Sequence, residues 1–270
     1  MSRNKSDTVI DIKFFDITQI KKDSIIVILG KRNSGKSVLI KHLLKSMEGL
    51  SIGTVISETD HVVHFYDQFI PGMFIYPEFS NTILEKVFYR QEKALENKWP
   101  NPYAFLLMDD CLSDAKAWAS NKKIKEIFYN GRHYKLLFIL AMQAPMGLPP
   151  AFRTNIDYTF IFKNNNFNDR KKIYENYAGC FESRQQFEAV LDSCTEDYHC
   201  LVINNVTRSN KLQDQVSFFK ANLHPDFKMC NNTLWHINNT QFNKSNKAPN
   251  VDKSVVQTKN NTYIINKKRR

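Results

Sequence analysis

The chain has 270 residues, a formal net charge of +11 and five cysteines, with 42% apolar and 24% charged residues. This composition excludes a wholly disordered chain and suits one large globular domain, and no apolar run is long enough to predict a membrane span or a secretory signal peptide. The basic excess favours a polyanionic partner, and the sparse, odd-numbered cysteines predict free thiols in a reducing compartment.

The first predicted strand lies at Ser24–Leu29, where an unbroken, mostly β-branched apolar run suits a strand covered on both faces. It leads into Gly30–Ser37, which matches the phosphate-loop pattern G-x-x-x-x-G-K-[ST] at every fixed position. An apolar helical stripe follows, from Leu39 to Met47. The expected nucleotide-binding residues are Gly30, Lys31, Arg32, Asn33, Ser34, Gly35, Lys36, Ser37 and Val38.

Each fixed residue of this loop has a chemical reason. Gly30 and Gly35 allow the backbone to turn its N–H groups toward a phosphate chain. Lys36 is expected to reach the β- and γ-phosphates, and the Ser37 hydroxyl to bind Mg²⁺, at the positive end of the following helix. The sequence therefore predicts ATP and Mg²⁺ as cofactors.

A second apolar strand, predicted at Tyr103–Met108, leads directly into Asp109 and Asp110, 73 residues after Lys36. Asp109 is expected to serve the metal as the Walker B carboxylate, and Asp110 to orient the attacking water. The long spacing suits ATPases, in which another strand separates the phosphate-loop strand from the aspartate strand. It suits nucleotide kinases and small GTPases less well.

A third buried strand, predicted at Leu136–Met142, ends at Gln143. Ligands of open α/β sheets bind at the carboxyl ends of such strands, so Gln143 is expected to sense the γ-phosphate or position water. Arg132, just before this strand, and Arg153, after it, are candidates for an arginine finger that acts on a neighbouring subunit.

The remaining patterns alternate between strand and helix, which predicts an α/β fold with a mostly parallel central sheet flanked by helices. The other predicted strands are Gly53–Ser57, Met73–Tyr76, Tyr158–Phe162 and His199–Asn204, and the other predicted helices are 80–98, 120–131, 166–178 and 182–192.

Residues 231–270 differ from the rest because they contain eight basic residues, one acidic residue and ten asparagines. This segment carries +7 of the charge and leaves +4 for residues 1–230. We expect 1–230 to form the P-loop ATPase domain and 231–270 to be a mostly disordered arm ending in Lys267-Lys268-Arg269-Arg270. The arm would bind phosphates, act as a localisation signal or have no specific role.

A zinc site is a weak alternative for one group of residues, because their spacing does not follow the paired pattern of zinc ligands. The group consists of Cys180, Cys194, His199 and Cys200. Buried or free thiols are the preferred interpretation.

Taken in order, Gly30–Ser37, Leu106–Asp110, Gly131–His133 and Gln143 resemble the HerA/FtsK superfamily of P-loop ATPases. The similarity is greatest to the poxvirus-type genome-packaging ATPases of large double-stranded DNA viruses, and it covers about residues 20–205. The resemblance implies a RecA-like (ASCE) P-loop core and a homo-oligomeric ring, typically a hexamer, that pumps double-stranded DNA into a capsid. It further implies a capsid or portal partner and a location in the host cytoplasm or nucleus, at the site of virion assembly or with the virion.

The resemblance also implies roles for single residues. Lys36 and Ser37 would bind nucleotide and Mg²⁺, Asp109 would serve the metal and Asp110 would activate water. The others would be the strand-end sensor, Gln143, and the finger acting in trans, Arg132 or Arg153. One departure is Asp110 itself, since the superfamily usually has glutamate there. Two alternatives remain open at this stage: a P-loop nucleotide or small-molecule kinase, and a non-catalytic nucleotide-binding DNA scaffold.

Overall fold

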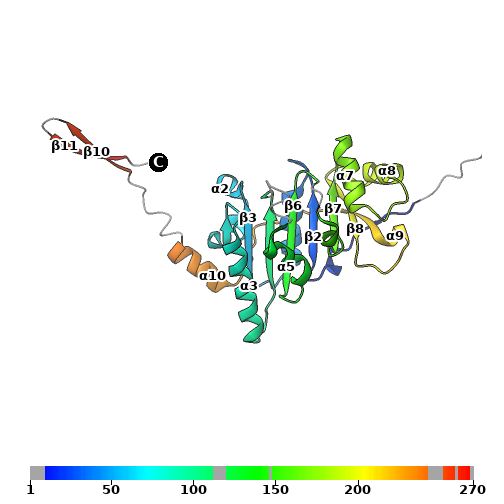
Figure 1. Cartoon of the computed structure of the whole chain (residues 1–270), viewed down its shortest axis with the longest axis horizontal. Helices are drawn as coiled ribbons and strands as arrows, with labels where there is room; N and C mark the ends of the chain where they lie inside the picture. The colour runs from blue at the N-terminus through cyan, green and yellow to red at the C-terminus, as the bar shows by residue number, and fades with distance from the viewer. Residues whose placement is uncertain (1–9, 112–119, 146–147, 243–251, 259–260, 268–270) are drawn as a thin grey trace, which may run out of the picture.

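The computed structural model describes residues 10–111, 120–145, 148–242, 252–258 and 261–267 (Figure 1). Within these ranges, nine strands form one sheet in the order β1-β9-β8-β7-β2-β6-β5-β3-β4. The strands are β1 (Lys13–Phe14), β2 (Ile25–Leu29), β3 (Ile52–Ser57), β4 (Ile75–Tyr76), β5 (Ala104–Asp109), β6 (Leu136–Met142), β7 (Tyr158–Phe162), β8 (His199–Asn204) and β9 (Val216–Lys220).

Helices cover both faces of this sheet. The α-helices are α1 (Lys36–Ser46), α2 (Asp60–Val63), α3 (Asn81–Glu96), α5 (Lys122–Asn130), α6 (Pro150–Arg153), α7 (Phe167–Tyr177), α8 (Arg184–Cys194), α9 (Leu212–Gln215) and α10 (Asn232–Ile237). Single turns of 3₁₀-helix are η1 (Ile17–Gln19), η2 (Tyr66–Gln68) and η3 (Gly72–Phe74), and η4 (Asn238–Phe242) is a π-helical turn.

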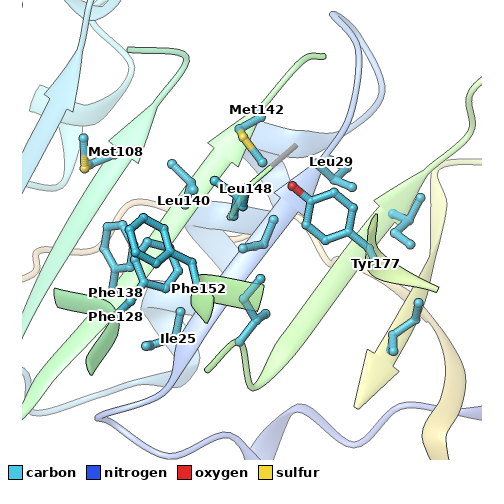
Figure 2. Packing of buried hydrophobic residues seen from close by; sticks show 14 of the residues in the cluster. Ile25, Leu29, Met108, Phe128, Phe138, Leu140, Met142, Leu148, Phe152 and Tyr177 are labelled. Carbon is cyan, nitrogen blue, oxygen red and sulfur yellow. The ribbon is translucent and has the colours of Figure 1, made fainter. Parts of the chain in front are cut away.

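The alternation of side chains along β2 divides the core into two layers. Ile25, Val27 and Leu29 pack on the face covered by α3, α5, α7 and α8, whereas Ile26 and Ile28 face α1. Because both faces are covered, β2, β5 and β6 are buried at every position. Figure 2 shows part of the first layer, where Phe128 and Phe152 stack with ring centroids 4.6 Å apart.

The predicted α/β architecture is confirmed, with β2, β3, β4, β5, β6 and β7 joined by parallel pairings. The exception is β8, which pairs antiparallel with both β7 and β9. The strand predicted at Met73–Tyr76 is shorter, since its first half forms η3. The two strands of this sheet that sequence reasoning missed, β1 and β9, lie at one side of it, and β1 has only two residues.

The segment expected to be a disordered arm begins differently from that expectation. Residues 232–242 form α10 and η4, and the buried Asn238 accepts a hydrogen bond from the Met73 N–H group at 3.0 Å. These contacts attach 231–242 to the domain. Further on, β10 (Asp252–Thr258) and β11 (Asn261–Lys267) form an antiparallel hairpin. The last three residues of the predicted basic cluster lie outside the described residues.

Among the described helices, none has both the length and the apolar character that crossing a bilayer requires.

Candidate active site

The strand order brings the predicted motifs to one edge of the sheet. β6 lies between β2, which precedes the phosphate loop, and β5, which ends in Asp109. The inserted strand therefore comes later in the chain than both motifs. Hydrogen bonds from the Gly30 N–H to the Met142 carbonyl and from the Asp110 N–H to the Ala141 carbonyl extend the ladders beyond the strand ends. Both motifs and Gln143 thus meet at the carboxyl edge.

The phosphate loop has the backbone that its glycines were expected to allow. Gly35 has φ +101°, in the left-handed region, and immediately precedes α1. A Cβ atom on Gly30 would lie 2.5 Å from Ser34 Oγ and 2.9 Å from the Phe162 ring, so a larger residue does not fit there. α1 starts at Lys36 without a side-chain cap, which leaves its first N–H groups free to bind an anion.

Four of the predicted residues form one cluster above this edge. Lys36 Nζ lies 2.6 Å from Asp110 Oδ2 and 3.1 Å from Asp109 Oδ1, and Gln143 Nε2 donates to Asp110 Oδ2 at 2.5 Å. Lys36 and Asp109 are only 7% and 6% exposed. Burial raises the pKa of Asp109, and the Lys36 ammonium opposes that rise. Two carboxylates thus face one ammonium, which leaves negative charge unmatched.

A cavity of about 1060 Å³ opens over the cluster. Such a volume is at the upper end of ligand pockets, which span roughly 300–1,000 Å³. The cavity lies between the segment 59–66 and the segments that precede β8 and follow β9. It is lined by Lys31, Arg32, Asn33, Gly35, Lys36, Ser37, Val38, Thr59, Asp60, Val63, Phe65, Tyr66, Asp109, Asp110, Gln143, Tyr198, Lys220, Ala221 and Leu223.

Among the cavity residues that sequence reasoning missed, Tyr66 and Asp60 are linked to the acidic cluster. The Tyr66 hydroxyl donates to Asp109 Oδ2 at 2.7 Å, and Asp60 Oδ1 accepts the backbone N–H groups of Phe65 and Tyr66. Burial, followed by the charge of Asp109, raises the pKa of Tyr66. The available signal was their position just after β3, since β3 pairs with β5 and places Ser57 opposite Asp109.

The residues of the cluster fit Mg²⁺. Asp109 Oδ1 is buried and has no hydrogen-bond partner beside its ion pair with Lys36. A carboxylate and a hydroxyl are oxygen ligands of the kind that Mg²⁺ takes, usually together with waters and substrate phosphates. Ser37 would hold the ion directly, and Asp109 through a water or the Ser37 hydroxyl. Elsewhere in the described ranges, no three His, Cys, Asp or Glu side chains are gathered for a metal, the Cys180–Cys200 set included.

The two predicted finger arginines lie away from this cavity. Arg132 is at the amino edge of the sheet, paired with the buried Asp157, which also accepts the Ile25 N–H at 2.8 Å. Arg153 donates to two backbone carbonyls at the end of α7. In this chain neither guanidinium lines the nucleotide cavity, so a role in trans stays a prediction.

No family model matches the chain. Its relatives in sequence are proteins of large DNA viruses. It is 40% identical over 215 residues to uncharacterized protein L437 of Acanthamoeba polyphaga mimivirus, with 77% of this chain and 76% of that protein covered. It is 36% identical over 237 residues to uncharacterized protein 088R of Invertebrate iridescent virus 3, with 82% and 90% covered. Protein 075L of Invertebrate iridescent virus 6 is 42% identical over 188 residues, with 69% and 72% covered.

In structure, the chain is similar to the genome packaging NTPase B204 from Sulfolobus turreted icosahedral virus 2 in complex with AMPPCP. The TM-score is 0.52 at 20% identity, with 75% of this chain and all of that chain covered. The DNA-packaging ATPase B204 from Sulfolobus turreted icosahedral virus gives a TM-score of 0.52 at 21% identity, with the same coverage. At this identity the likeness concerns the fold, and it confirms the RecA-like P-loop architecture predicted from the sequence.

Proposed function

This chain belongs to the family of large-DNA-virus proteins that includes mimivirus L437 and the iridescent virus proteins 088R and 075L, and we propose that it is an ATP-hydrolysing motor that translocates double-stranded DNA. We further propose that its task is to package a viral genome into the capsid. The structurally similar B204 proteins are described as genome packaging NTPases, which supports this choice of DNA-handling function.

The observation that carries the proposal is the convergence of Lys36, Asp109, Asp110 and Gln143 on one cavity at the carboxyl edge of β2, β5 and β6. A phosphate loop alone binds nucleotides in many enzyme classes. Two acids and an amide at the same edge add the groups that hydrolysis needs. The insertion of β6 between the phosphate-loop strand and the aspartate strand favours an ATPase over a kinase.

The side chains have distinct tasks when MgATP is bound. Mg²⁺ would neutralise charge on the phosphates, held by Ser37 and Asp109. Lys36, whose ammonium lies against both acids, would bind the β- and γ-phosphates. Release of Lys36 would leave Asp110 Oδ2 with the Gln143 amide as its partner. These two groups would orient the attacking water, and the Asp110 carboxylate would accept its proton.

We propose that the chain assembles into a ring in which one arginine acts on the neighbouring subunit. A finger must act on a neighbour, because Arg132 and Arg153 do not reach their own cavity. Arg132 is the better candidate, since 58% of its side chain is exposed. If it acts in trans in a hexamer or another ring, Arg132→Ala and Lys36→Ala subunits, each inactive alone, should recover part of the turnover when mixed.

The DNA and capsid partners rest on charge and fold. The domain up to residue 230 carries only +4, so its basic residues must be placed along a channel to act on DNA. The arm beyond it carries +7 and would add salt-dependent phosphate contacts that ignore sequence. We also propose that the protein works at the site of virion assembly, with a capsid or portal component as its partner.

Displacement of a third strand from a duplex is the experiment that tests the motor. With MgATP, the wild-type chain should strip a triplex-forming strand from duplex DNA, and the rate should fall as salt is raised. Analysis of the products separates the other classes. Phosphate on an organic acceptor would indicate a kinase, and ATP binding without either hydrolysis or displacement would indicate a non-catalytic scaffold.

A further inference from the structure

Tyr66 contributes a buried hydroxyl to the site that the proposed chemistry has not used. The side chain is 2% exposed, and its hydroxyl donates to Asp109 Oδ2 at 2.7 Å. We propose that Tyr66 is a positioning residue that holds the Asp109 carboxylate in the orientation that serves Mg²⁺. This inference rests on the proposed function and deepens it.

The two oxygens of Asp109 have different surroundings. Oδ2 accepts from Tyr66, while Oδ1 faces Lys36 Nζ at 3.1 Å and has no hydrogen-bond donor besides that ammonium. Ser57 lies opposite Asp109 in the β3–β5 ladder, yet its buried hydroxyl bonds to neither oxygen. Tyr66 is therefore the one uncharged donor to this carboxylate within the described chain. By occupying Oδ2, it leaves Oδ1 turned toward the phosphate loop.

Tyr66 is itself fixed at both ends of its side chain. Asp60 is 4% exposed, and its Oδ1 accepts the Phe65 and Tyr66 N–H groups at 2.9 and 2.8 Å, which pins the backbone beside the ring. The ring packs edge-on against Phe65, with centroids 5.1 Å apart, and against Phe69. Because the Tyr66 hydroxyl is held in this way, rotation of the Asp109 carboxylate would break the hydrogen bond between them. This bond therefore favours the observed orientation of the carboxylate.

Removal of the hydroxyl should loosen the metal site without emptying it. In Tyr66→Phe the ring and its packing remain, but Asp109 Oδ2 loses its donor and the carboxylate can turn toward Ser57. Partners that orient metal ligands typically change metal affinity 10–100-fold. We expect about a tenfold loss of metal affinity, with the affinity for metal-free nucleotide unchanged.

The test uses Mn²⁺ as the probe, with the full chain and the non-hydrolysable analogue AMPPCP, and measures free Mn²⁺ by electron paramagnetic resonance. Tyr134→Phe is the matched control. It removes a hydroxyl that donates to Glu126 at 2.9 Å, far from the cavity, and should leave Mn²⁺ affinity unchanged. In the background of Asp109→Asn, Tyr66→Phe should cause no further loss, because Tyr66 acts through Asp109.

Equal Mn²⁺ affinity in the wild type and in folded Tyr66→Phe would overturn the inference while leaving the proposed function intact. A wild-type chain that binds no Mn²⁺ with AMPPCP would instead contradict the proposed function. If Tyr66→Phe does not fold, Asp60→Ala provides the second variant, since it releases the backbone at Tyr66 and keeps the hydroxyl. It should give a smaller loss of Mn²⁺ affinity than removal of the hydroxyl, and no loss would count against the positioning role.

Discussion

The two edges of the sheet both carry an ion pair with a buried carboxylate, but the pairs differ in how complete they are. At the amino edge, Asp157 binds Arg132 and the Ile25 N–H, so each of its oxygens has a partner. At the carboxyl edge, Lys36 is shared between Asp109 and Asp110, and Asp109 Oδ1 has no hydrogen-bond donor besides this shared ammonium. Only the carboxyl edge opens into the cavity of about 1060 Å³ that the phosphate loop lines.

The difference shows how similar residue types do different work. Asp157 finds all its partners within its own chain, and it thereby links the start of β2 to the segment before β6. Such a carboxylate has a structural role. A cluster with more acids than bases keeps capacity for a ligand that brings positive charge. The comparison predicts that changes at the carboxyl edge reduce turnover, whereas loss of Asp157 at the amino edge reduces stability and leaves Arg132, the proposed finger, in the chain.

The largest effect is expected from Lys36→Ala. Loss of the ammonium removes the group that stabilises charge on the phosphates, and single preorganised donors of this kind are worth about 100–1,000-fold in rate. We expect the rate of ATP hydrolysis to fall roughly a thousandfold. Circular dichroism should show the native fold, so that the loss is assigned to the site.

Asp110→Asn should reduce turnover by a few hundredfold, within the roughly 100–10,000-fold contribution of general bases, while nucleotide affinity changes little. The amide keeps the hydrogen-bonding shape but cannot accept a proton from water. Stopped-flow binding and steady-state hydrolysis separate the two quantities. The control is Asp192→Asn, which should retain full turnover. Asp192 is an exposed residue of α8 that pairs with Arg170 of α7. A matching loss of ATP affinity in Asp110→Asn would assign Asp110 to binding instead.

Asp157→Ala tests the opposite edge. It leaves the Ile25 N–H without an acceptor, and we expect the free energy of unfolding to fall by about 2–3 kcal/mol. Turnover per folded chain should remain within about twofold at a temperature where the variant is folded. Urea denaturation and hydrolysis assays measure both. A large loss of turnover with unchanged stability would break the distinction between the edges.

The smallest effect is expected at a third polar pair, which His42 on α1 forms with His224 in the segment after β9. His42 is 8% exposed, lies beside Phe219, and its Nδ1 is 2.7 Å from His224 Nε2. Burial, and then the charge of His224, lowers the pKa of His42 below its ordinary value of 6.5. As the pH falls, the unfolded chain therefore protonates His42 before the folded chain does. The free energy of unfolding should keep its full His42 contribution above pH 6.5 and decrease as the pH falls below that value. His42→Gln should make the decline shallower in urea titrations at pH 5.5 and 7.5.

Most of the fold and the centre of the site followed from local patterns. The unbroken apolar runs at β2, β5 and β6 predict buried parallel strands, and the residues that follow them predict where Lys36, Asp109, Asp110 and Gln143 meet. Tyr66 and Asp60 could not be found in this way. Their role depends on the pairing of β3 with β5, which is a contact between segments about fifty residues apart.

The missed strands of the large sheet have a similar cause. Alternation of apolar and polar residues is weak in β1 and β9, and their places in the sheet depend on tertiary pairing, since β9 pairs with β8 and β1 pairs with β9. The partner of Arg132 was also hidden from the sequence, because Asp157 lies 25 residues further along and meets it only when β7 aligns with β2. The sequence predicts the order of the motifs along the chain. It does not predict which strands pair, and this pairing brings residues such as Tyr66 and Asp157 to their partners.

Release of inorganic phosphate from MgATP, with and without duplex DNA at low salt, tests the central claim most directly. The account predicts that the wild-type chain hydrolyses ATP, that duplex DNA increases the rate, and that Lys36→Ala removes the activity under both conditions. Hydrolysis by the wild type at the rate of Lys36→Ala, whether or not DNA is present, would contradict it.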